Sequence, residues 1–240
     1  MSTDAPSLQN KHVAIIGGSS GVGLALGRVS AAAGARVTLL ARDEARLQAA
    51  ASQVPNAKAL TLDLLKSETV ARAAEALDAV DHLVITAGTF GPASLADSDP
   101  EDWRRKFEER IVGPSLMIKL LAPRITRSIT LFSGLTSRRP YAGIGVGAAL
   151  AAGLEGLTRA LALELSPVRV NVIVPGMIDT PMLDQALGAN KAQIWAETER
   201  KLPARHIASA DDAAQAVLFL MTNPYVTGAS IVFDGGAVMI

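Results

Sequence analysis

The sequence predicts an α/β fold in which one doubly wound parallel sheet of about seven strands carries helices on both faces. Two observations support this prediction. Short β-branched or aliphatic runs alternate along the chain with longer segments rich in Ala, Leu, Glu and Arg, and a glycine-rich turn follows the first run. Because a strand–helix–strand crossover forces parallel pairing with right-handed connections, the alternation indicates helices on both faces of one sheet.

The elements follow in order from these runs. Buried parallel strands are short and almost continuously apolar, and we expect them at 12–16, 36–40, 57–62, 82–86, 128–132, 168–174 and 230–233. The segments between them have the length and composition of helices, several of which begin after Ser, Asp or Pro at a plausible cap. We expect these helices at 21–33, 44–53, 68–77, 100–121, 147–165 and 211–221.

At 240 residues, about half of them apolar, the chain is long enough to bury the core of a single domain over residues 1–240. The stretch 176–210 departs from the alternation, since it carries Pro181, Gly188 and Pro203 around an amphipathic piece at 191–201. We interpret this stretch as a substrate lid. Ligands of such a sheet bind beyond the carboxyl ends of its strands.

Charge and composition exclude several classes of function. Lys and Arg together number 23, as do Asp and Glu, so the electrostatic footprint of a nucleic-acid binder is missing. Residues 1–11 lack an apolar signal-peptide core, and the longest uncharged stretch, 141–154, is shorter than the roughly 18 residues of a membrane span. The sequence has no cysteine, which excludes disulfides and cysteine-bound zinc. We expect no metal site, no membrane contact and a soluble, cytoplasmic protein.

The glycine-rich turn reads Gly17-Gly18-Ser19-Ser20-Gly21-Val22-Gly23 and has the spacing G-x-x-x-G-x-G. Its glycines allow backbone conformations that a Cβ disfavours and let a pyrophosphate approach bare backbone. The next helix offers N–H donors and a favourable dipole at its N-terminus, and Ser19 and Ser20 add hydroxyls. An ordinary strand-to-helix turn is the alternative, but the position of the motif in an alternating chain favours dinucleotide binding.

The second strand ends at Leu39-Leu40-Ala41-Arg42. A site for NAD usually places a carboxylate here, whereas the phosphorylated ribose of NADP needs a cation. Ala41 and Arg42 therefore favour NADP, with NADPH preferred over NADH. The alternative is that Arg42 is a solvated surface residue, and the neighbouring Asp43 offsets its charge.

With its remaining motifs, the chain resembles the short-chain dehydrogenase/reductase family over nearly its whole length. The motifs that carry the resemblance are the Gly17 turn, Asp63-Leu64, Ala87-Gly88, LEGLTRALA at 154–162, VNVIVPGMIDT at 170–180, and Gly228 with Asp234-Gly235-Gly236. The resemblance implies a Rossmann-like fold.

The resemblance also implies roles for individual residues. In the family, the residue matching Asp63 hydrogen-bonds the adenine, the Ala-Gly pair lines the adenosine ribose, and the Pro-Gly-x-Ile-x-Thr segment holds the nicotinamide amide. Cofactor-binding roles are thereby implied for Asp63, Leu64, Ala87, Gly88, Pro175, Gly176, Ile178 and Thr180. For each of them an ordinary strand-end turn is the alternative.

The catalytic set that the resemblance implies is missing from this chain. The family uses a Ser, a Tyr and a Lys four residues after the Tyr, with an Asn on the preceding long helix. Tyr and Lys one helical turn apart share a face, so the ammonium lowers the pKa of the phenol that exchanges a proton with the substrate. In the register set by 154–162, these four positions fall on Gly134, Gly147, Ala151 and Arg110. We therefore assign no catalytic residue.

Other side chains offer alternatives for the lost groups. Ser133, Thr136 and Tyr141 are close enough in sequence to reach the site, and Arg138 and Arg139 can supply positive charge, although a solvated loop is the simpler interpretation. We expect structural or surface roles for His12 and His82, which begin strands at the edge opposite the site, and for His206 in a late loop.

The sequence thus predicts an NADP(H)-binding oxidoreductase that acts on an unknown carbonyl or alcohol with a non-standard proton donor and is weak on ordinary substrates. The alternative is a catalytically silent dinucleotide-binding sensor or partner subunit. The resemblance further implies a homodimer or homotetramer. The uncharged stretch 148–154 and the apolar tail 237–240 fit such an assembly.

Overall fold

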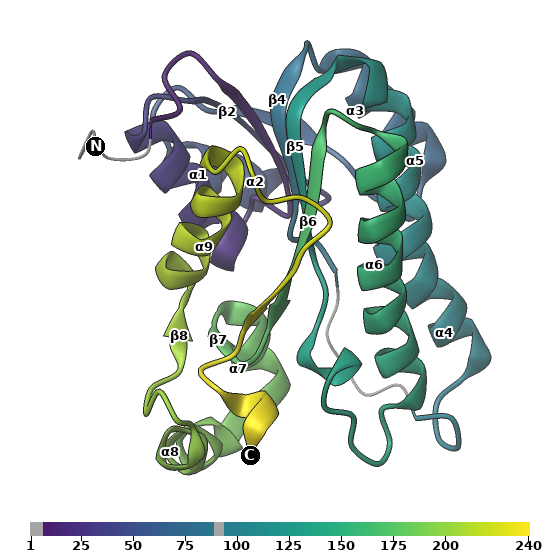
Figure 1. The fold of residues 1–240 in the computed structure, drawn as a ribbon, viewed down its shortest axis with the longest axis vertical. Helices are drawn as coiled ribbons and strands as arrows, with labels where there is room; N and C mark the ends of the chain where they lie inside the picture. The colour runs from purple at the N-terminus through teal and green to yellow at the C-terminus, as the bar shows by residue number, and fades with distance from the viewer. Residues whose placement is uncertain (1–6, 89–93) are drawn as a thin grey trace.

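A seven-stranded, fully parallel sheet forms the centre of the computed structural model, which describes residues 7–88 and 94–240 (Figure 1). The strands are β1 (His12–Ile16), β2 (Arg36–Ala41), β3 (Lys58–Thr61), β4 (Val80–Ile85), β5 (Ile125–Phe132), β6 (Arg169–Pro175) and β9 (Ser230–Phe233). Their order in the sheet is β3-β2-β1-β4-β5-β6-β9. The chain winds outward from β1 to β3 and then returns to β4, which confirms the predicted doubly wound sheet.

Helices cover both faces of the sheet. One face packs against α1 (Gly21–Ala32), α2 (Glu44–Ala51) and α9 (Ala210–Thr222), and the other against α3 (Ser67–Ala76), α5 (Gly113–Leu121) and α6 (Gly145–Glu164). In Figure 1 the first group lies to the left of the strands, and α5 and α6 lie to the right.

The buried strands supply side chains to both faces in turn. In β1, Val13 and Ile15 belong to the core beneath α1 and α9, whereas Ala14 and Ile16 belong to the core on the other face. All four are at most 1% exposed. This two-residue alternation explains why the strands of a sheet covered on both sides are apolar throughout.

Caps at the helix starts match the residues that predict them. Asp43 accepts the Arg46 N–H at the start of α2 (3.0 Å). Ser209 and Asp212 form a reciprocal capping box at α9. These polar residues satisfy N–H groups that the first turn of a helix leaves without acceptors.

The predicted helix over 100–121 is interrupted, which corrects that expectation. It consists of α4 (Pro100–Phe107), a π-helical turn (Glu108–Val112) and α5. Short 3-10 turns follow at Ala122–Arg124 and, after β5, at Leu135–Ser137. The π-helical turn carries both Glu109 and Arg110 into the neighbourhood of the strand ends.

The segment after β6 forms a small subdomain at the foot of Figure 1. It contains α7 (Pro181–Leu187), a 3-10 turn (Gly188–Asn190) and α8 (Lys191–Lys201). The short strands β7 (Ile178–Asp179) and β8 (Ala208–Ser209) pair in parallel and close the segment at its base. A final 3-10 turn, Ala237–Met239, ends the chain beyond β9.

Among the described residues, α6 is the one helix long and apolar enough to pass for a membrane span by length and composition. Leu150, Ala151 and Leu154 of this helix are nevertheless buried, and α6 packs against β6. It also carries Glu155, which is 4% exposed. The apolar character of α6 is therefore accounted for in part by its packing on the sheet.

Candidate functional site

The glycine-rich turn joins β1 to α1 at the carboxyl edge of the sheet. Gly17 and Gly21 have left-handed φ angles of +92° and +51°, a conformation that favours glycine. A Cβ on Gly23 would lie 2.2 Å from the Gly17 carbonyl oxygen. The turn therefore closes on itself only because these side chains are missing.

The start of α1 retains hydrogen-bonding capacity. Ser20 is its N-cap, but the Ser20 side chain makes no capping hydrogen bond, and the first turn of α1 contains no acidic residue. Ser19, Ser20 and Val22 are half-buried. N–H groups at a helix start together with serine hydroxyls are suited to bind an anion.

The end of β4 lies directly against the turn. The N–H of Ala87 donates to the Ile16 carbonyl (3.2 Å), and a Cβ on Gly17 would lie 2.7 Å from the Ala87 nitrogen. Gly88 has a φ of +151°, and a Cβ there would lie 3.0 Å from Nε of Arg110. The structure thus places Ala87 against the turn and Gly88 against Arg110.

The end of β3 lies further along the same edge. The Asp63 carboxylate accepts the N–H of Leu65 (3.1 Å), and the Asp63 N–H donates to the Thr69 hydroxyl (3.1 Å). Leu64 is 6% exposed, and its carbonyl oxygen lies 2.3 Å from where a Cβ on Gly113 would be. Leu64 therefore packs closely beneath α5, and Asp63 shapes the loop after β3.

Arg42, beyond the end of β2, faces a carboxylate that sequence reasoning missed. Its guanidinium lies 3.9 Å from the Glu109 carboxylate, with the Arg42 side chain 63% exposed and that of Glu109 10% exposed. Asp43, which we expected to offset the charge of Arg42, is engaged as the cap of α2. The pairing of residues 42 and 109 cannot be predicted from helical periodicity, because the π-helical turn sets the direction of Glu109.

The segment after β6 reaches back to the glycine-rich turn. Pro175 is the last residue of β6, and the Gly176 N–H donates to the Phe233 carbonyl (2.9 Å). Ile178 pairs with Ala208 in the small sheet. The Thr180 methyl group lies 3.2 Å from the position of a Cβ on Gly21. Residues about 160 positions apart in sequence are thus neighbours at this edge.

The positions of the expected catalytic set hold no proton donor. Gly134 follows β5 in an extended conformation (φ −163°), and Gly147 lies in the first turn of α6. Ala151 is 3% exposed, and its carbonyl oxygen accepts the Ser133 hydroxyl (2.7 Å). Ser133 is consequently engaged in holding β5 to α6.

Arg110 is a buried cation at the end of β5. Its Nη2 donates to the carbonyl oxygens of Phe132 and Ser133 (3.2 Å each). Its Nε is buried and has no hydrogen-bond partner in the part of the chain that the structure describes. Burial lowers the pKa of Arg110, and the nearby Glu109 opposes this shift. The position to which the resemblance assigns an Asn thus carries a buried guanidinium.

The loop before α6 holds most of its polar side chains in hydrogen bonds. Arg138 forms an ion pair with the buried Glu155, and Arg139 donates to the Ala237 carbonyl (2.8 Å). Burial alone would raise the pKa of Glu155, but hydrogen bonds from Ser137, Arg138 and Ser230 outweigh it and lower the pKa. Arg138 is therefore not simply solvated, whereas Tyr141 is 57% exposed.

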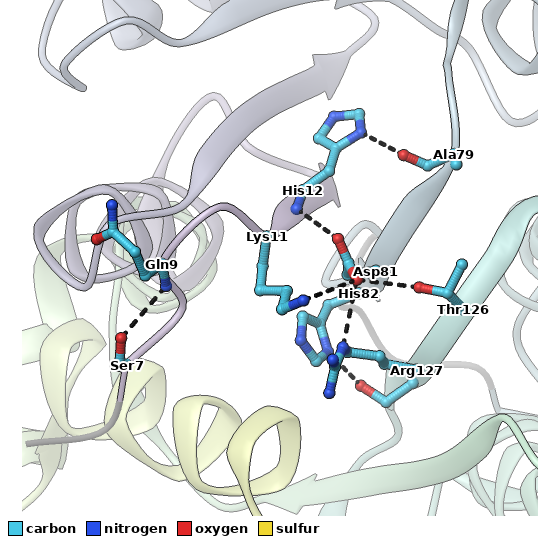
Figure 2. Close-up of polar contacts among 10 residues, drawn as sticks. Ser7, Gln9, Lys11, His12, Ala79, Asp81, His82, Thr126 and Arg127 are labelled. Carbon is cyan, nitrogen blue, oxygen red and sulfur yellow. Dashed lines mark hydrogen bonds and ion pairs between the residues drawn. The ribbon is translucent and has the colours of Figure 1, made fainter.

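The opposite edge of the sheet contains the two buried histidines (Figure 2). His12 bonds through Nδ1 to the Ala79 carbonyl and through Nε2 to the Thr38 hydroxyl (2.9 Å each). His82 bonds through Nδ1 to the Ser128 hydroxyl (2.8 Å). Burial lowers the pKa of His82 to about 4.

Asp81 lies at the centre of the contacts in Figure 2. Its carboxylate accepts the N–H of His12 (2.9 Å), the hydroxyl of Thr126 (3.0 Å) and Nε of Arg127 (3.3 Å). Burial raises its pKa, but the hydrogen bonds from His12 and Thr126 and the charge of Lys11 together lower it below the ordinary value. The cluster ties β1, β4 and β5 together at the edge away from the glycine-rich turn.

Within the segment 176–210, one lysine joins three elements. Nζ of Lys191 pairs with Asp179 (3.1 Å) and Asp184 (2.5 Å) and lies 4.7 Å from the centre of the Trp195 ring. A groove of about 650 Å³ beside it is lined by Asp179, Lys191 and Trp195 among others. The groove is a feature of the segment 176–210, since its lining residues all lie between Asp179 and Glu199.

The comparisons with known proteins agree with this geometry. A family model described as enoyl-(acyl carrier protein) reductase matches residues 17–238. The chain is 31% identical to the short-chain dehydrogenase/reductase ATR9 of Stachybotrys chlorohalonatus over 97% of this chain and 98% of that protein. It is 33% identical to carbonyl reductase family member 4 of Danio rerio over 92% of this chain and 95% of the relative.

A solved structure shares the fold closely. An NADPH-bound short chain oxidoreductase from Pseudomonas aeruginosa PAO1, described as containing an atypical catalytic center, superposes with a TM-score of 0.88 at 29% identity. The match covers 95% of this chain and 98% of that one. The strand order, the glycine-rich turn and these full-length matches together show that the chain belongs to the short-chain dehydrogenase/reductase family.

Proposed function

We propose that the chain is an NADP(H)-dependent oxidoreductase that acts on a carbonyl or alcohol substrate and turns over ordinary substrates slowly. One contrast carries this proposal. The glycine-rich turn keeps the bare backbone that a pyrophosphate needs, while Gly134, Gly147 and Ala151 offer no group that can transfer a proton. The edge thus keeps the features that bind a dinucleotide but lacks the tyrosine that serves as proton donor in the family.

The residues at this edge fit a dinucleotide. In our proposal Gly17, Ser19, Ser20, Gly21, Val22 and Gly23 hold the pyrophosphate against the start of α1. Asp63, Leu64, Ala87 and Gly88 hold the adenosine, and Pro175, Gly176, Ile178 and Thr180 hold the nicotinamide amide. A bound cofactor of this class supplies the hydride, and the protein supplies orientation and electrostatics.

Arg42 supports NADP as the cofactor. A guanidinium binds a phosphate strongly through charge-assisted hydrogen bonds, and the Arg42 side chain is exposed enough to reach a ligand. NADPH is also bound by the Pseudomonas aeruginosa neighbour. The Arg42 guanidinium lies 3.9 Å from the Glu109 carboxylate. At that distance the ion pair is weak, so a 2′-phosphate can replace the carboxylate as the partner of Arg42.

Fluorescence titration with NADPH and NADH tests this cofactor preference. We expect NADPH to bind more tightly, and Arg42→Ala to weaken NADPH about tenfold while leaving NADH unchanged, since one charge-assisted hydrogen bond is lost. Arg46→Ala on α2 removes the same charge nearby and serves as the matched control. Equal binding of the two nucleotides by the unaltered protein, or no binding, would contradict the proposal.

Turnover separates this proposal from its alternative. General acid–base catalysis typically contributes about 100- to 10,000-fold, so we expect measurable but slow NADPH oxidation with a carbonyl panel. A catalytically silent sensor or partner subunit is the second candidate, favoured by the same Gly147 and Ala151. NADPH binding without any turnover identifies that candidate, whereas rapid turnover reveals a proton donor that the structure does not indicate.

We also propose one domain over residues 1–240, with 176–210 as its lid, and a homodimer or homotetramer in solution. The lid proposal is supported by the Thr180 methyl group, which lies 3.2 Å from the position of a Cβ on Gly21. The assembly is supported by apolar side chains left exposed on α6 and on the C-terminal tail, where Leu163 is 82% and Met239 is 73% exposed.

A further inference from the structure

One hydroxyl in the loop after β5 is left without a partner. Ser133 donates to the Ala151 carbonyl, and Ser137 donates to the Gly134 carbonyl (2.9 Å). Thr136 is half-buried, and within the described ranges its hydroxyl makes no hydrogen bond. A half-buried hydroxyl that the fold does not use is available to a ligand.

Thr136 also lies where the missing side chain would be. The 3-10 turn Leu135–Ser137 folds the chain back, so the Thr136 Oγ1 atom lies 3.8 Å from the position of a Cβ on Gly134. Apart from the adjoining residues, no other atom of the described structure lies within 4 Å of that position. Position 134 thus opens onto space that has the Thr136 hydroxyl at its rim.

Arg110 places positive charge behind the same strand end. It is held by the carbonyl oxygens of Phe132 and Ser133, the two residues that precede Gly134. The Nε group points at no acceptor in the described structure. A fixed cation in a site of low dielectric stabilises negative charge that develops nearby.

We propose that the Thr136 hydroxyl donates a hydrogen bond to the carbonyl oxygen of the substrate, in place of the hydroxyl missing at position 134. The Arg110 guanidinium is a positioning residue, because it holds the strand end that precedes the Thr136 turn. This inference rests on the proposed oxidoreductase function.

A substrate class follows from the acidity of these two groups. Neither a threonine hydroxyl nor a guanidinium releases a proton near neutral pH, so the proton must come from water. A simple ketone would then form an alkoxide with its whole charge on one oxygen. A carbonyl conjugated to a carbon–carbon double bond forms an enolate instead, in which the charge is delocalised, and the site should favour this class.

The atoms balance for such a substrate. The β-carbon accepts the hydride of a reduced nicotinamide dinucleotide, and the π electrons of the double bond shift to give the enolate. Thr136 holds the enolate oxygen. Water then protonates the α-carbon and leaves as hydroxide, so the products are the saturated carbonyl compound and the oxidised dinucleotide.

Steady-state kinetics with 2-cyclohexenone and NADPH test the role of Thr136. We expect Thr136→Val to lower kcat/KM on the order of 100-fold, mainly through kcat, as removal of an oxyanion donor does. NADPH affinity should not change. Thr222→Val, at the far end of α9, is the matched control and should leave kcat/KM unaltered.

Gly134→Ser in the Thr136→Val background provides the rescue. The extended φ at 134 suits any residue, and a Cβ there meets nothing closer than 3.8 Å outside the adjoining residues in the described structure. The restored serine hydroxyl should recover much of the lost kcat. A protein damaged merely by poor folding at position 136 would not be rescued in this way.

The infrared band of the carbonyl group gives a second readout that needs no turnover. In the complex with NADP⁺ and 2-cyclohexenone, the carbonyl stretch should lie at lower frequency in the unaltered protein than in Thr136→Val. An unchanged band together with unchanged kcat/KM overturns the role of Thr136, even where NADPH binding and turnover uphold the proposed function. A protein that binds NADPH but shows neither turnover nor a shifted band also overturns it.

Cyclohexanone, the matched saturated ketone, tests the substrate class. The unaltered protein should convert 2-cyclohexenone to cyclohexanone and reduce added cyclohexanone far more slowly. Faster reduction of cyclohexanone, or an allylic alcohol as the product from 2-cyclohexenone, overturns the preference for conjugated carbonyls.

Discussion

At the glycine-rich turn, single residues are constrained by space rather than by polarity. The missing Cβ of Gly23 is the sharpest case, because it would lie 2.2 Å from a backbone oxygen of Gly17, which cannot rotate away as a side chain can. Gly156 in α6 is different, since its Cβ would meet only the end of the flexible Arg159 side chain at 4.0 Å. An added methyl group should therefore destabilise the fold at Gly23 but not at Gly156.

We expect Gly23→Ala to lower the free energy of unfolding by about 1–3 kcal/mol, because overpacking forces the backbone to shift. It should also abolish NADPH binding. Gly156→Ala should instead raise the free energy of unfolding by about 0.5–1 kcal/mol, since alanine restricts the unfolded chain and favours the helix. Urea unfolding and nucleotide titration measure both effects. Intact NADPH binding by Gly23→Ala would show that the turn does not hold the pyrophosphate.

At the scale of elements, the strands and helices were predictable because burial on both faces of a sheet demands apolar runs of fixed length. The π-helical turn Glu108–Val112 was not, since its wider turn leaves no mark on helical periodicity. The π-helical turn places Glu109 opposite Arg42. The 3-10 turn after β5 sets the position of Thr136. The site residues that sequence motifs predict lie at the ends of strands. The contacts of Glu109 and Thr136 depend on how the turns pack, which no motif indicates.

The lid offers a test at the same scale. Lys191 begins α8 and pairs with Asp179 of β7 and with Asp184 of α7, so one side chain joins three elements. Because the pairs are exposed, their loss should leave global unfolding unaltered and act only on local opening. We expect Lys191→Met to speed amide hydrogen exchange in residues 181–201 by about two- to fivefold.

Lys201→Met, at the other end of α8, is the control for this change. It removes the same charge, and no ion pair of Lys201 with a described residue is recorded. Equal exchange rates in both variants would show that the Lys191 pairs do not restrain the lid.

Across the whole molecule, the two edges of the sheet carry different chemistry. The carboxyl edge presents glycines, uncapped N–H groups and the Thr136 hydroxyl, whereas the opposite edge buries His12 and His82 and holds the half-buried Asp81 in hydrogen bonds (Figure 2). Polar groups satisfied within the fold stabilise it, and we propose that those left at the carboxyl edge bind ligands. The opposite edge is therefore one place where pH should act on stability.

His82 makes this dependence measurable. Burial lowers its pKa from 6.5 to about 4, against the attraction of Asp81 and with the help of Arg169 and Arg127. Well above pH 6.5 the His82 side chain is neutral in both states, so it contributes no dependence of stability on pH. Below 6.5 the unfolded chain takes up a proton that the folded protein does not, so stability falls by about 3 kcal/mol as the pH drops to 4.

Urea unfolding between pH 7 and pH 4 should therefore show a steep loss of stability in the unaltered protein. His82→Gln removes the titrating group from the same place, so its stability, though lower at pH 7, should fall with a slope reduced by up to about 1.4 kcal/mol per pH unit. His206→Gln changes an exposed histidine in a late loop and should keep the original slope. If His82→Gln lost stability as steeply as the unaltered protein, burial of His82 would not be the source of the acid sensitivity.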